Sequence, residues 1–384
     1  AGVPFWQIAY SNELRLRETY DALGVLPATV EPRATGHIPE MHTLIEKLID
    51  AGHAYDVNGD VYFDVRSWPN YGQLSGQRPD AMQPTEGGVQ GKKFPLDFAL
   101  WKNEKPTEPQ DAYWPSPWGR GRPGWHIECS DMSWRYLGEE FDIHGGGLDI
   151  QFPHHENEVA QSTAAGFGFA RYWVHHALLN FGGEKMSKSI GNVVDLDSLL
   201  AKGLRPIDVR YYLAAPHYRS VIEYSDEAVS EAAIAYKRIE NFIRRATEIL
   251  GDVPAGVIGA EFVSAMNDDL NTSRALAAIH ETVRHGNAAL ADGKHNAARE
   301  ALASLRAMLD ILGLDPLDPQ WTDVGDGKNF KHTIDSLVAL ALEQRNAARA
   351  RKDFAAADTI RDQLKHSGIN VEDTANGPRW TLGD

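Results

Sequence analysis

The spacing of apolar and polar residues first indicates two helices near the start of the chain. Over residues 11–24 and 38–52, apolar side chains recur every three or four positions, as on one face of an α-helix. Each segment closes on a glycine, Gly24 or Gly52, and a glycine just past the last turn commonly ends a helix. We therefore expect two surface helices that end at these glycines.

A β-hairpin is expected directly after the second helix. Residues 54–57 and 60–65 are rich in β-branched and aromatic side chains, and Asn58-Gly59 between them favours a tight two-residue turn. From about residue 66 to 125, prolines, glycines and tryptophans interrupt every regular pattern, ending in WPSPWGRGRPGW. This stretch predicts an inserted, loop-rich module.

The pattern changes again between residues 126 and 215, where short apolar runs alternate with helical segments. The runs are 141–144 and 172–181, and the helical segments are 154–166, 195–202 and 206–215. Such alternation is typical of an α/β unit built on parallel strands.

Nearly everything after residue 226 has helical spacing with short connections, which predicts a helical bundle. Residues 314–330 differ in composition and are a candidate linker. A last helix over 353–367 leads to a second expected Asn-Gly hairpin, at Asn376 and Gly377. The helices expected in the bundle and beyond it are 226–250, 260–269, 273–290, 295–313 and 331–349.

Composition narrows the class of protein. With 384 residues, 42% hydrophobic and 24% charged, the chain resembles an ordinary folded protein of two or three domains. It has no apolar run long enough for a membrane span and no signal-like opening segment. The single cysteine, Cys129, excludes an internal disulfide. We expect a cytoplasmic protein, and the start at Ala1 without an initiator methionine suggests processing or truncation.

The net charge of the chain argues against a nucleic-acid partner, whereas basic residues in its tail could bind one. The 54 acidic and 38 basic residues leave a formal charge of −16, which would repel a polyanion at long range. Basic residues in the tail could still form a nucleic-acid surface near Trp380, but acidic residues interleave with them, so a solvated amphipathic face is an equal alternative. These basic residues are Arg345, Arg349, Arg351, Lys352, Arg361 and Lys365.

A candidate metal site lies in the segment HHENE, which follows Phe152-Pro153. His154 and Glu158 are four positions apart, so they share one face of a helix and could bind one cation. An ordinary polar helix face is the alternative. Cys129 would complete a plausible zinc set of thiolate, imidazole and carboxylate, and its place near the start of a helix predicts a lowered pKa. A fourth ligand is not accounted for.

Two glycine-containing segments could bind a ligand. Gly145, Gly146 and Gly147 follow the 141–144 strand, at the edge where α/β sheets bind ligands, although a tight turn alone is the alternative. The second segment is Lys185-Met186-Ser187-Lys188-Ser189, flanked by glycines on both sides. Such a loop could close over a polyphosphate and neutralise charge on the leaving group, whereas a solvated basic loop is the alternative.

The motifs GWHIECS, FDIHGGGLDIQFPHHENEVAQS and KMSKSIGN, in this order and spacing, resemble the cysteinyl-tRNA synthetase family of class I aminoacyl-tRNA synthetases, of the actinobacterial type. The similarity runs from EPRATGHIPE near residue 31 to the tail. It implies an incomplete α/β Rossmann-type catalytic domain, then an α-helical bundle for anticodon binding and a small α+β tail. The implied domains are a connective insertion at 1–125, the second half of the catalytic domain at 126–225, the bundle at 226–315 and an anticodon-recognition subdomain at 330–384.

The resemblance also implies a reaction and its ligands. Cysteine is activated with ATP and Mg²⁺ and then transferred to the 3′ end of tRNA-Cys, by a cytoplasmic protein that we expect to be a monomer. One Zn²⁺ is implied at Cys129, His154 and Glu158, where a substrate thiolate would be favoured over the hydroxyl of serine. The residues implied to bind cysteine or ATP are Trp125, His144, Gly145, Gly146, Asp149, Lys185, Met186, Ser187, Lys188 and Ser189, with Lys185 and Lys188 acting on the phosphates.

One departure from the family concerns the upstream part. The family's HIGH signature and first zinc cysteine precede the residue that matches Ala1, so we expect the fourth zinc ligand upstream and little activity from this chain alone. Two alternatives stay open. One is the cysteine ligase of mycothiol biosynthesis, which shares the catalytic core but ends soon after the bundle. The other is a truncated, non-catalytic paralogue that binds zinc or tRNA.

Overall fold

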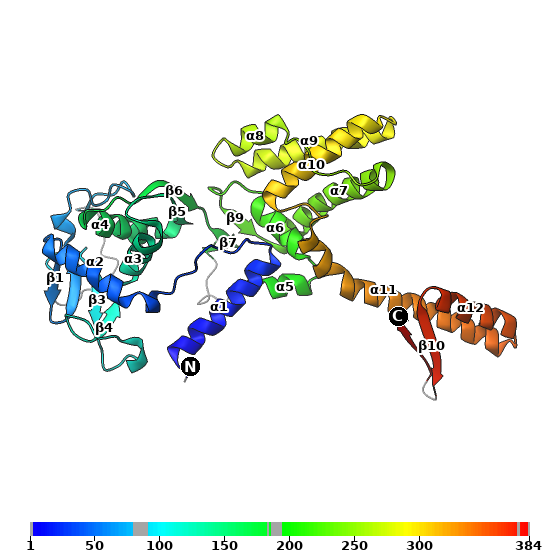
Figure 1. Ribbon diagram of the computed structural model, residues 1–384, viewed down its shortest axis with the longest axis horizontal. Helices are drawn as coiled ribbons and strands as arrows, with labels where there is room; N and C mark the ends of the chain where they lie inside the picture. The colour runs from blue at the N-terminus through cyan, green and yellow to red at the C-terminus, as the bar shows by residue number, and fades with distance from the viewer. Residues whose placement is uncertain (1–2, 80–90, 183, 186–193, 375–376, 383–384) are drawn as a thin grey trace. The chain divides into compact units, whose positions relative to one another are not determined.

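The computed structural model of the chain describes residues 3–79, 91–182, 184–185, 194–374 and 377–382 (Figure 1). It divides into two units, residues 1–314 and 315–384. Among the helices of the described residues, none combines the length and the apolar character needed to cross a membrane.

The first unit begins with the two expected helices. Helix α1 spans Phe5–Ala22, so it starts ahead of the predicted residue 11, and none of its residues is buried. Helix α2 spans Ile38–Asp50, after a short 3₁₀ turn at Ala34–Gly36. Gly24 and Gly52 follow the two helices with φ of 66° and 80°, which confirms both as terminators. The apolar face of α2 is buried and forms part of the core around Trp101.

A four-stranded antiparallel sheet packs against α2. Its strands are β1 (Ala54–Val57), β2 (Asp60–Phe63), β3 (Phe98–Asn103) and β4 (Gly121–Pro123), in that order. The Asn58-Gly59 hairpin is confirmed, since β1 pairs with β2 and both turn residues have positive φ. The described part of 66–125 is rich in turns and loops, as expected, but it also supplies β3 and β4, and β3 lies inside the sheet with its first four residues buried.

The expected α/β unit follows, and it positions the candidate site. It contains α3 (Trp125–Leu137), β5 (Phe141–Gly147), 3₁₀ turn Leu148–Ile150, the turn Gln151–His155, α4 (Glu156–Ala164) and β6 (Ala170–His176). Strands β5 and β6 are parallel, as predicted. The run 172–181 was expected as one strand but forms two, because β7 (Leu179–Phe181) leaves β6 and joins β8 (Glu184–Lys185) and β9 (Ile222–Tyr224).

Helices α5 (Leu196–Ala201) and α6 (Pro206–Ala214) connect this unit to the helical bundle. The bundle is confirmed: α7 (Asp226–Leu250), α9 (Thr272–Ala291) and α10 (His295–Leu312) pack on one another, and α8 (Ala260–Met266) packs on α9 (Figure 1). Ser225 and Asn271 cap the starts of α7 and α9 with their side chains. Gly286 of α9 lies so close to Phe242 of α7 that a Cβ atom would stand 2.3 Å from the ring.

Arg210 of α6 links two distant helix ends. Its guanidinium donates to the Leu312 carbonyl at the end of α10, at 2.8 and 3.0 Å, and to the Leu23 and Gly24 carbonyls just after α1, at 2.9 and 3.0 Å. Carbonyls at a helix end lack partners within the helix and carry partial negative charge. A cation is therefore favourable at this position.

The second unit contains α11 (Pro319–Ala350), α12 (Phe354–His366), β10 (Ile369–Thr374) and β11 (Gly377–Leu382). The predicted linker 314–330 is instead helical from Pro319, with Asp318 as its N-cap. The second hairpin is confirmed by the pairing of Thr374 with Gly377, although Asn376 lies outside the described residues. Arg345 is buried and Arg361 pairs with two aspartates, so the basic residues of the tail do not form one exposed surface. The four domain boundaries stay a prediction.

Candidate metal and substrate site

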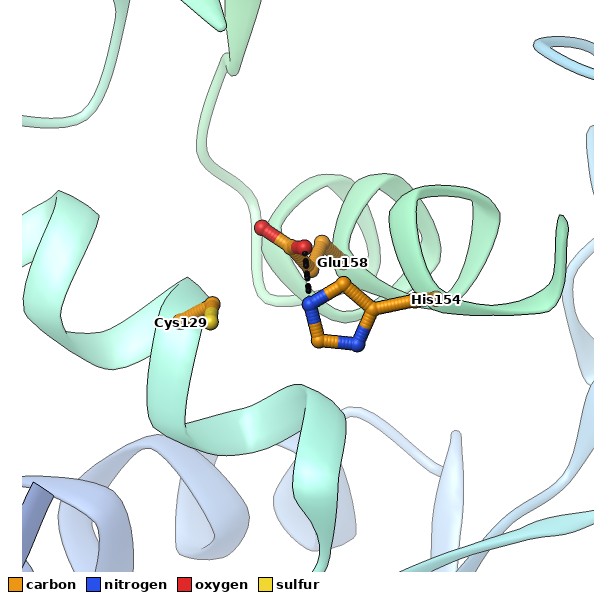
Figure 2. Close-up of side chains that lie close together, drawn as sticks. All are labelled: Cys129, His154 and Glu158. Atoms are coloured by element: carbon orange, nitrogen blue, oxygen red, sulfur yellow. Dashed lines mark ion pairs between the residues drawn. The ribbon is translucent and has the colours of Figure 1, made fainter. Parts of the chain in front are cut away.

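Three predicted metal ligands meet between α3 and α4. The Cys129 sulfur, a His154 ring nitrogen and a Glu158 carboxylate oxygen all lie within 4.8 Å of one another. Figure 2 shows Cys129 on one helix directed toward His154 and Glu158, which come from the segment that begins the other helix. His154 and Glu158 are 4% and 0% exposed. The four-residue spacing therefore places them on one face, as the sequence predicts.

The Glu158 carboxylate stands between two imidazole rings. Its Oε1 lies 2.8 Å from His154 Nε2, and its Oε2 lies 3.3 Å from His144 Nε2. Burial alone would raise the pKa of Glu158, but the two imidazoles outweigh it and lower the pKa to about 2. Both oxygens are fully buried, and neither makes a well-directed hydrogen bond to a described residue. An ionised, buried carboxylate without such bonds fits a cation ligand.

The pKa of Cys129 is shifted upward, in the opposite direction to that of Glu158. Burial, and then the nearby Glu158 and Glu128, raise the pKa of its thiol to about 12. The lowered pKa expected from the helix start was therefore wrong. Cys129 is the fifth residue of α3, beyond the first turn, where the helix dipole no longer dominates. The thiol must lose its proton before it can bind a metal, so the metal would have to supply that stabilisation.

A chain of further histidines, missed by sequence reasoning, surrounds the three ligands. His126 Nδ1 lies 2.9 Å from His154 Nδ1, and His155 Nδ1 lies 2.8 Å from His175 Nε2. His144, His155 and Glu158 form a second set of donor atoms within 4.8 Å of one another. His175 could have been found from the strand register, because it pairs with Gly146 across β5 and β6.

The remaining predicted residues near the site come from α3, β5 and the turn that follows. Trp125 begins α3 and stacks on the His154 ring, with 4.3 Å between ring centroids, while 54% of its surface stays exposed. Asp149 lies in the turn Leu148–Ile150, close to Gly147. Gly145 and Gly146 lie within β5 and not after it. A Cβ atom on Gly146 would stand 2.7 Å from the His155 ring, so this glycine makes room for that histidine.

The basic loop can be located only at its first residue. Lys185 lies in β8, opposite Asn180 of β7. Met186, Ser187, Lys188 and Ser189 lie outside the described residues. The prediction for these four residues therefore lies outside the part of the chain that the structure describes.

A pocket of about 600 Å³ borders the candidate site and includes Cys129 and His144 in its wall. Most of the wall is apolar or aromatic, as is usual for pockets that bind small molecules. Its other lining residues are Thr29, Val30, Pro32, Met132, Ser133, Tyr136 and Leu137. Of the three candidate metal ligands, Cys129 thus borders an open cavity.

Three family models match successive parts of the chain. Residues 1–234 match the class I (C) tRNA synthetase catalytic domain, residues 261–316 match the DALR domain, and residues 338–380 match the cysteinyl-tRNA ligase anticodon binding domain. The fold of methionyl-tRNA synthetase from Mycobacterium tuberculosis, solved in complex with methionyl-adenylate, is also similar. That match has a TM-score of 0.56 at 18% identity and covers 93% of this chain and 84% of the other.

Curated relatives match the chain along its whole length. Cysteine–tRNA ligase of Streptomyces griseus is 57% identical over 386 residues, which cover 100% of this chain and 82% of the relative. Those of a Nocardioides species and of Cutibacterium acnes are 54% and 52% identical, covering 99% and 100% of this chain and 82% and 80% of their own length.

The fold and the matches define the class: this is a chain of the class I aminoacyl-tRNA synthetases, as the sequence motifs predicted. The expected order, an α/β catalytic part followed by helical anticodon-binding parts, is confirmed with it. Identity above one half over the full length then narrows the class, and the chain belongs to the cysteine–tRNA ligase family.

Proposed function

We propose that the chain activates L-cysteine with ATP and transfers it to the 3′ end of tRNA-Cys. Its relatives are named cysteine–tRNA ligases, which supports this reaction. The observation that carries this proposal is the trio Cys129, His154 and Glu158, in which His154 and Glu158 are buried and the half-buried Cys129 lines an open pocket. A thiolate, an imidazole and a carboxylate together suit Zn²⁺, a metal of intermediate softness. Few other amino acids carry a side chain that would bind a metal ion at such a site.

Zinc at this site would be held by Cys129, His154 and Glu158. When bound, the ion supplies a ligand position that accepts a thiolate far better than a neutral hydroxyl, and so distinguishes cysteine from serine. The protein's part is orientation. Glu158 stays ionised at neutral pH, and Trp125 stacks against the His154 ring, which limits the rotation of that imidazole.

ATP with Mg²⁺ is the proposed second substrate. The cysteine carboxylate attacks the α-phosphate in line, the bond to the β-phosphate breaks and pyrophosphate leaves, so positioning and charge stabilisation suffice and no protein base is needed. We assign Lys185 and Lys188 to the ATP phosphates, and Met186, Ser187 and Ser189 to the same loop. The cysteine and adenylate pocket is assigned to Trp125, His144, Gly145, Gly146 and Asp149, where Asp149 would meet the substrate ammonium.

The proposed contact with tRNA rests on local charge, because the chain as a whole carries −16. Three arginines of α7, Arg238, Arg244 and Arg245, are exposed on the surface of the helix. Arg244 and Arg245 donate to asparagine side chains, and none of the three pairs with a carboxylate among the described residues. Guanidinium groups without a carboxylate partner remain available for phosphates.

The cysteine ligase of mycothiol synthesis is not favoured, because residues 338–380 match an anticodon binding domain. The experiment that tests the proposal measures cysteine-dependent exchange of pyrophosphate into ATP, by the protein expressed from its complete reading frame. Aminoacylation of tRNA-Cys follows as the second step, with serine as the competing amino acid. Pyrophosphate exchange without aminoacylation would favour the cysteine ligase of mycothiol synthesis. Absence of both activities would favour a non-catalytic paralogue.

We also propose that the protein works in the cytoplasm as a monomer. Light scattering at micromolar concentration tests the second statement, since a mass near 42.5 kDa for this chain is the expected result. A dimeric mass would contradict it.

A further inference from the structure

The segment His154–Glu158 makes contacts on all sides, and two of its residues bind a loop that follows strand β2 of the four-stranded sheet. His154 and Glu158 face α3, while His155 reaches His175 of β6. The side chains of Glu156 and Asn157 point in the remaining directions around the helix, and each residue is 1% exposed. Successive helical residues point about 100° apart, so five neighbours can meet partners around the whole circumference.

The loop that Glu156 and Asn157 contact is residues 71–75. Glu156 accepts two backbone N–H groups, from Gly72 at 2.9 Å and from Ser75 at 2.8 Å, one on each carboxylate oxygen. The Tyr71 hydroxyl donates to Asn157 Oδ1 at 2.6 Å. We call Tyr71, Glu156 and Asn157 the clamp. Its bonds cross between residues more than eighty positions apart in the sequence.

The start of α4 depends on outside support. No side chain caps this helix, and Phe152, just before it, leaves helical geometry with φ −132° and ψ 131°. Glu156 accepts one N–H of the 71–75 loop on each of its two carboxylate oxygens, so it ties the first turn of α4 to that loop. Burial, then the nearby Glu156, raise the pKa of Tyr71, which keeps the proton that its hydroxyl donates.

We propose that the clamp residues Tyr71, Glu156 and Asn157 are positioning residues that orient His154 and Glu158 for metal binding. The inference rests on the proposed function, since it takes the trio with Cys129 to be the metal site. Metal sites tolerate little displacement of their ligands. A rotation of the first turn of α4 by 10–20° would move these side chains by on the order of 1 Å, enough to weaken metal binding.

The experiment uses Tyr71→Phe, which deletes one hydroxyl and keeps the buried ring. Zinc affinity is measured by competition with a chelating dye, and ligand geometry by the visible absorption of the Co²⁺-loaded protein. We expect zinc affinity to fall about tenfold, and the Co²⁺ spectrum to change in position or intensity. Asn157→Leu should have a similar effect. Tyr71→Phe should then add little in the Asn157→Leu background, because both act through one hydrogen bond.

Tyr55→Phe is the matched control. The Tyr55 hydroxyl also donates to a buried acceptor at 2.6 Å, the Asp97 carboxylate, and lies in the same sheet module. This variant should lower the melting temperature but leave zinc affinity and the Co²⁺ spectrum at parental values. The inference is overturned if Tyr71→Phe keeps parental affinity and spectrum, or if Tyr55→Phe changes them as much.

The same measurements separate this inference from the proposed function. A parent protein that binds neither zinc nor cobalt would overturn the inference and the metal part of the proposal together. A parent that binds zinc but shows no cysteine-dependent exchange would refute the proposed activity alone. In that case the affinities of Tyr71→Phe and Tyr55→Phe still decide the inference.

Discussion

Asp131 carries a buried carboxyl group that makes no hydrogen bond to any described residue, and its replacement by alanine should stabilise the protein. The residue lies on α3, two positions past Cys129 and so on the opposite face, and it is 0% exposed. Neither of its carboxylate oxygens has a hydrogen-bond partner among the residues that the structure describes. Burial, and then Glu40, raise the pKa of Asp131 from 3.8 to about 7, although His37 and Arg135 act in the other direction.

The pH dependence follows from this shift. An acid with a higher pKa in the folded than in the unfolded chain binds its proton more tightly when folded, so stability is lost as pH rises from about 4 to about 7. The penalty is about 1.5 kcal/mol at pH 5 and about 4 kcal/mol at pH 8. The smaller volume of alanine costs the same at both pH values. The gain from Asp131→Ala should therefore be about 2.5 kcal/mol larger at pH 8 than at pH 5.

Urea unfolding followed by tryptophan fluorescence tests this prediction, on protein kept metal-free with a chelator at pH 5 and pH 8. The control is Asp310→Ala, because Asp310 is an exposed aspartate of a helix and its replacement should shift stability equally at both pH values. An equal gain for Asp131→Ala at both pH values would refute the assigned pKa. A loss of stability at pH 8 would show that the carboxylate has a partner.

Three further results are expected. Gly286→Ala should lower stability by about 1–3 kcal/mol, because its Cβ would stand 2.3 Å from the Phe242 ring, and an unchanged melting temperature would contradict this packing. Arg244→Gln combined with Arg245→Gln should weaken tRNA binding and reduce its salt dependence by about two counterions, without affecting pyrophosphate exchange. Lys294→Gln, which removes a lysine already paired with an aspartate, should leave both measurements unchanged. Zinc binding should release about one proton, from the Cys129 thiol, and titration in weak buffer that detects no release would contradict the raised pKa.

Local patterns predicted those parts of the fold that local interactions determine. Helical periodicity identified α2 and α7, and the Asn58-Gly59 turn identified the first hairpin, because each depends on neighbours in sequence. Strand β3 was missed because its short apolar run is surrounded by prolines and glycines, and it becomes a strand only through pairing with β2 and β4. The start of α11 was missed although Asp318-Pro319 is a typical helix opening, since prolines and glycines nearby suggested a linker.

The candidate site, too, could be predicted from the sequence only where its contacts are local. His154 and Glu158 could be paired from their spacing within one helix, and the structure confirms that they lie together. The contacts of Glu158 with His144, and of His155 with His175, depend on how β5 and β6 pack against α4, which spacing alone does not reveal. The pKa of Cys129 was predicted in the wrong direction because burial and the charge of Glu158 are properties of the folded chain.

The way in which Arg210 joins the ends of α1 and α10 has a consequence for how related sequences can diverge. All of its acceptors are backbone carbonyls, of Leu23, Gly24 and Leu312, and every amino acid supplies a carbonyl. Mutations at the acceptor positions therefore preserve the hydrogen bonds of Arg210 as long as the backbone conformation is unchanged. Position 210 is constrained chemically, since a lysine cannot reach three carbonyls with a planar set of donors, and position 24 is constrained by a positive φ that favours glycine. We expect drift among relatives at 23 and 312, and an arginine at 210.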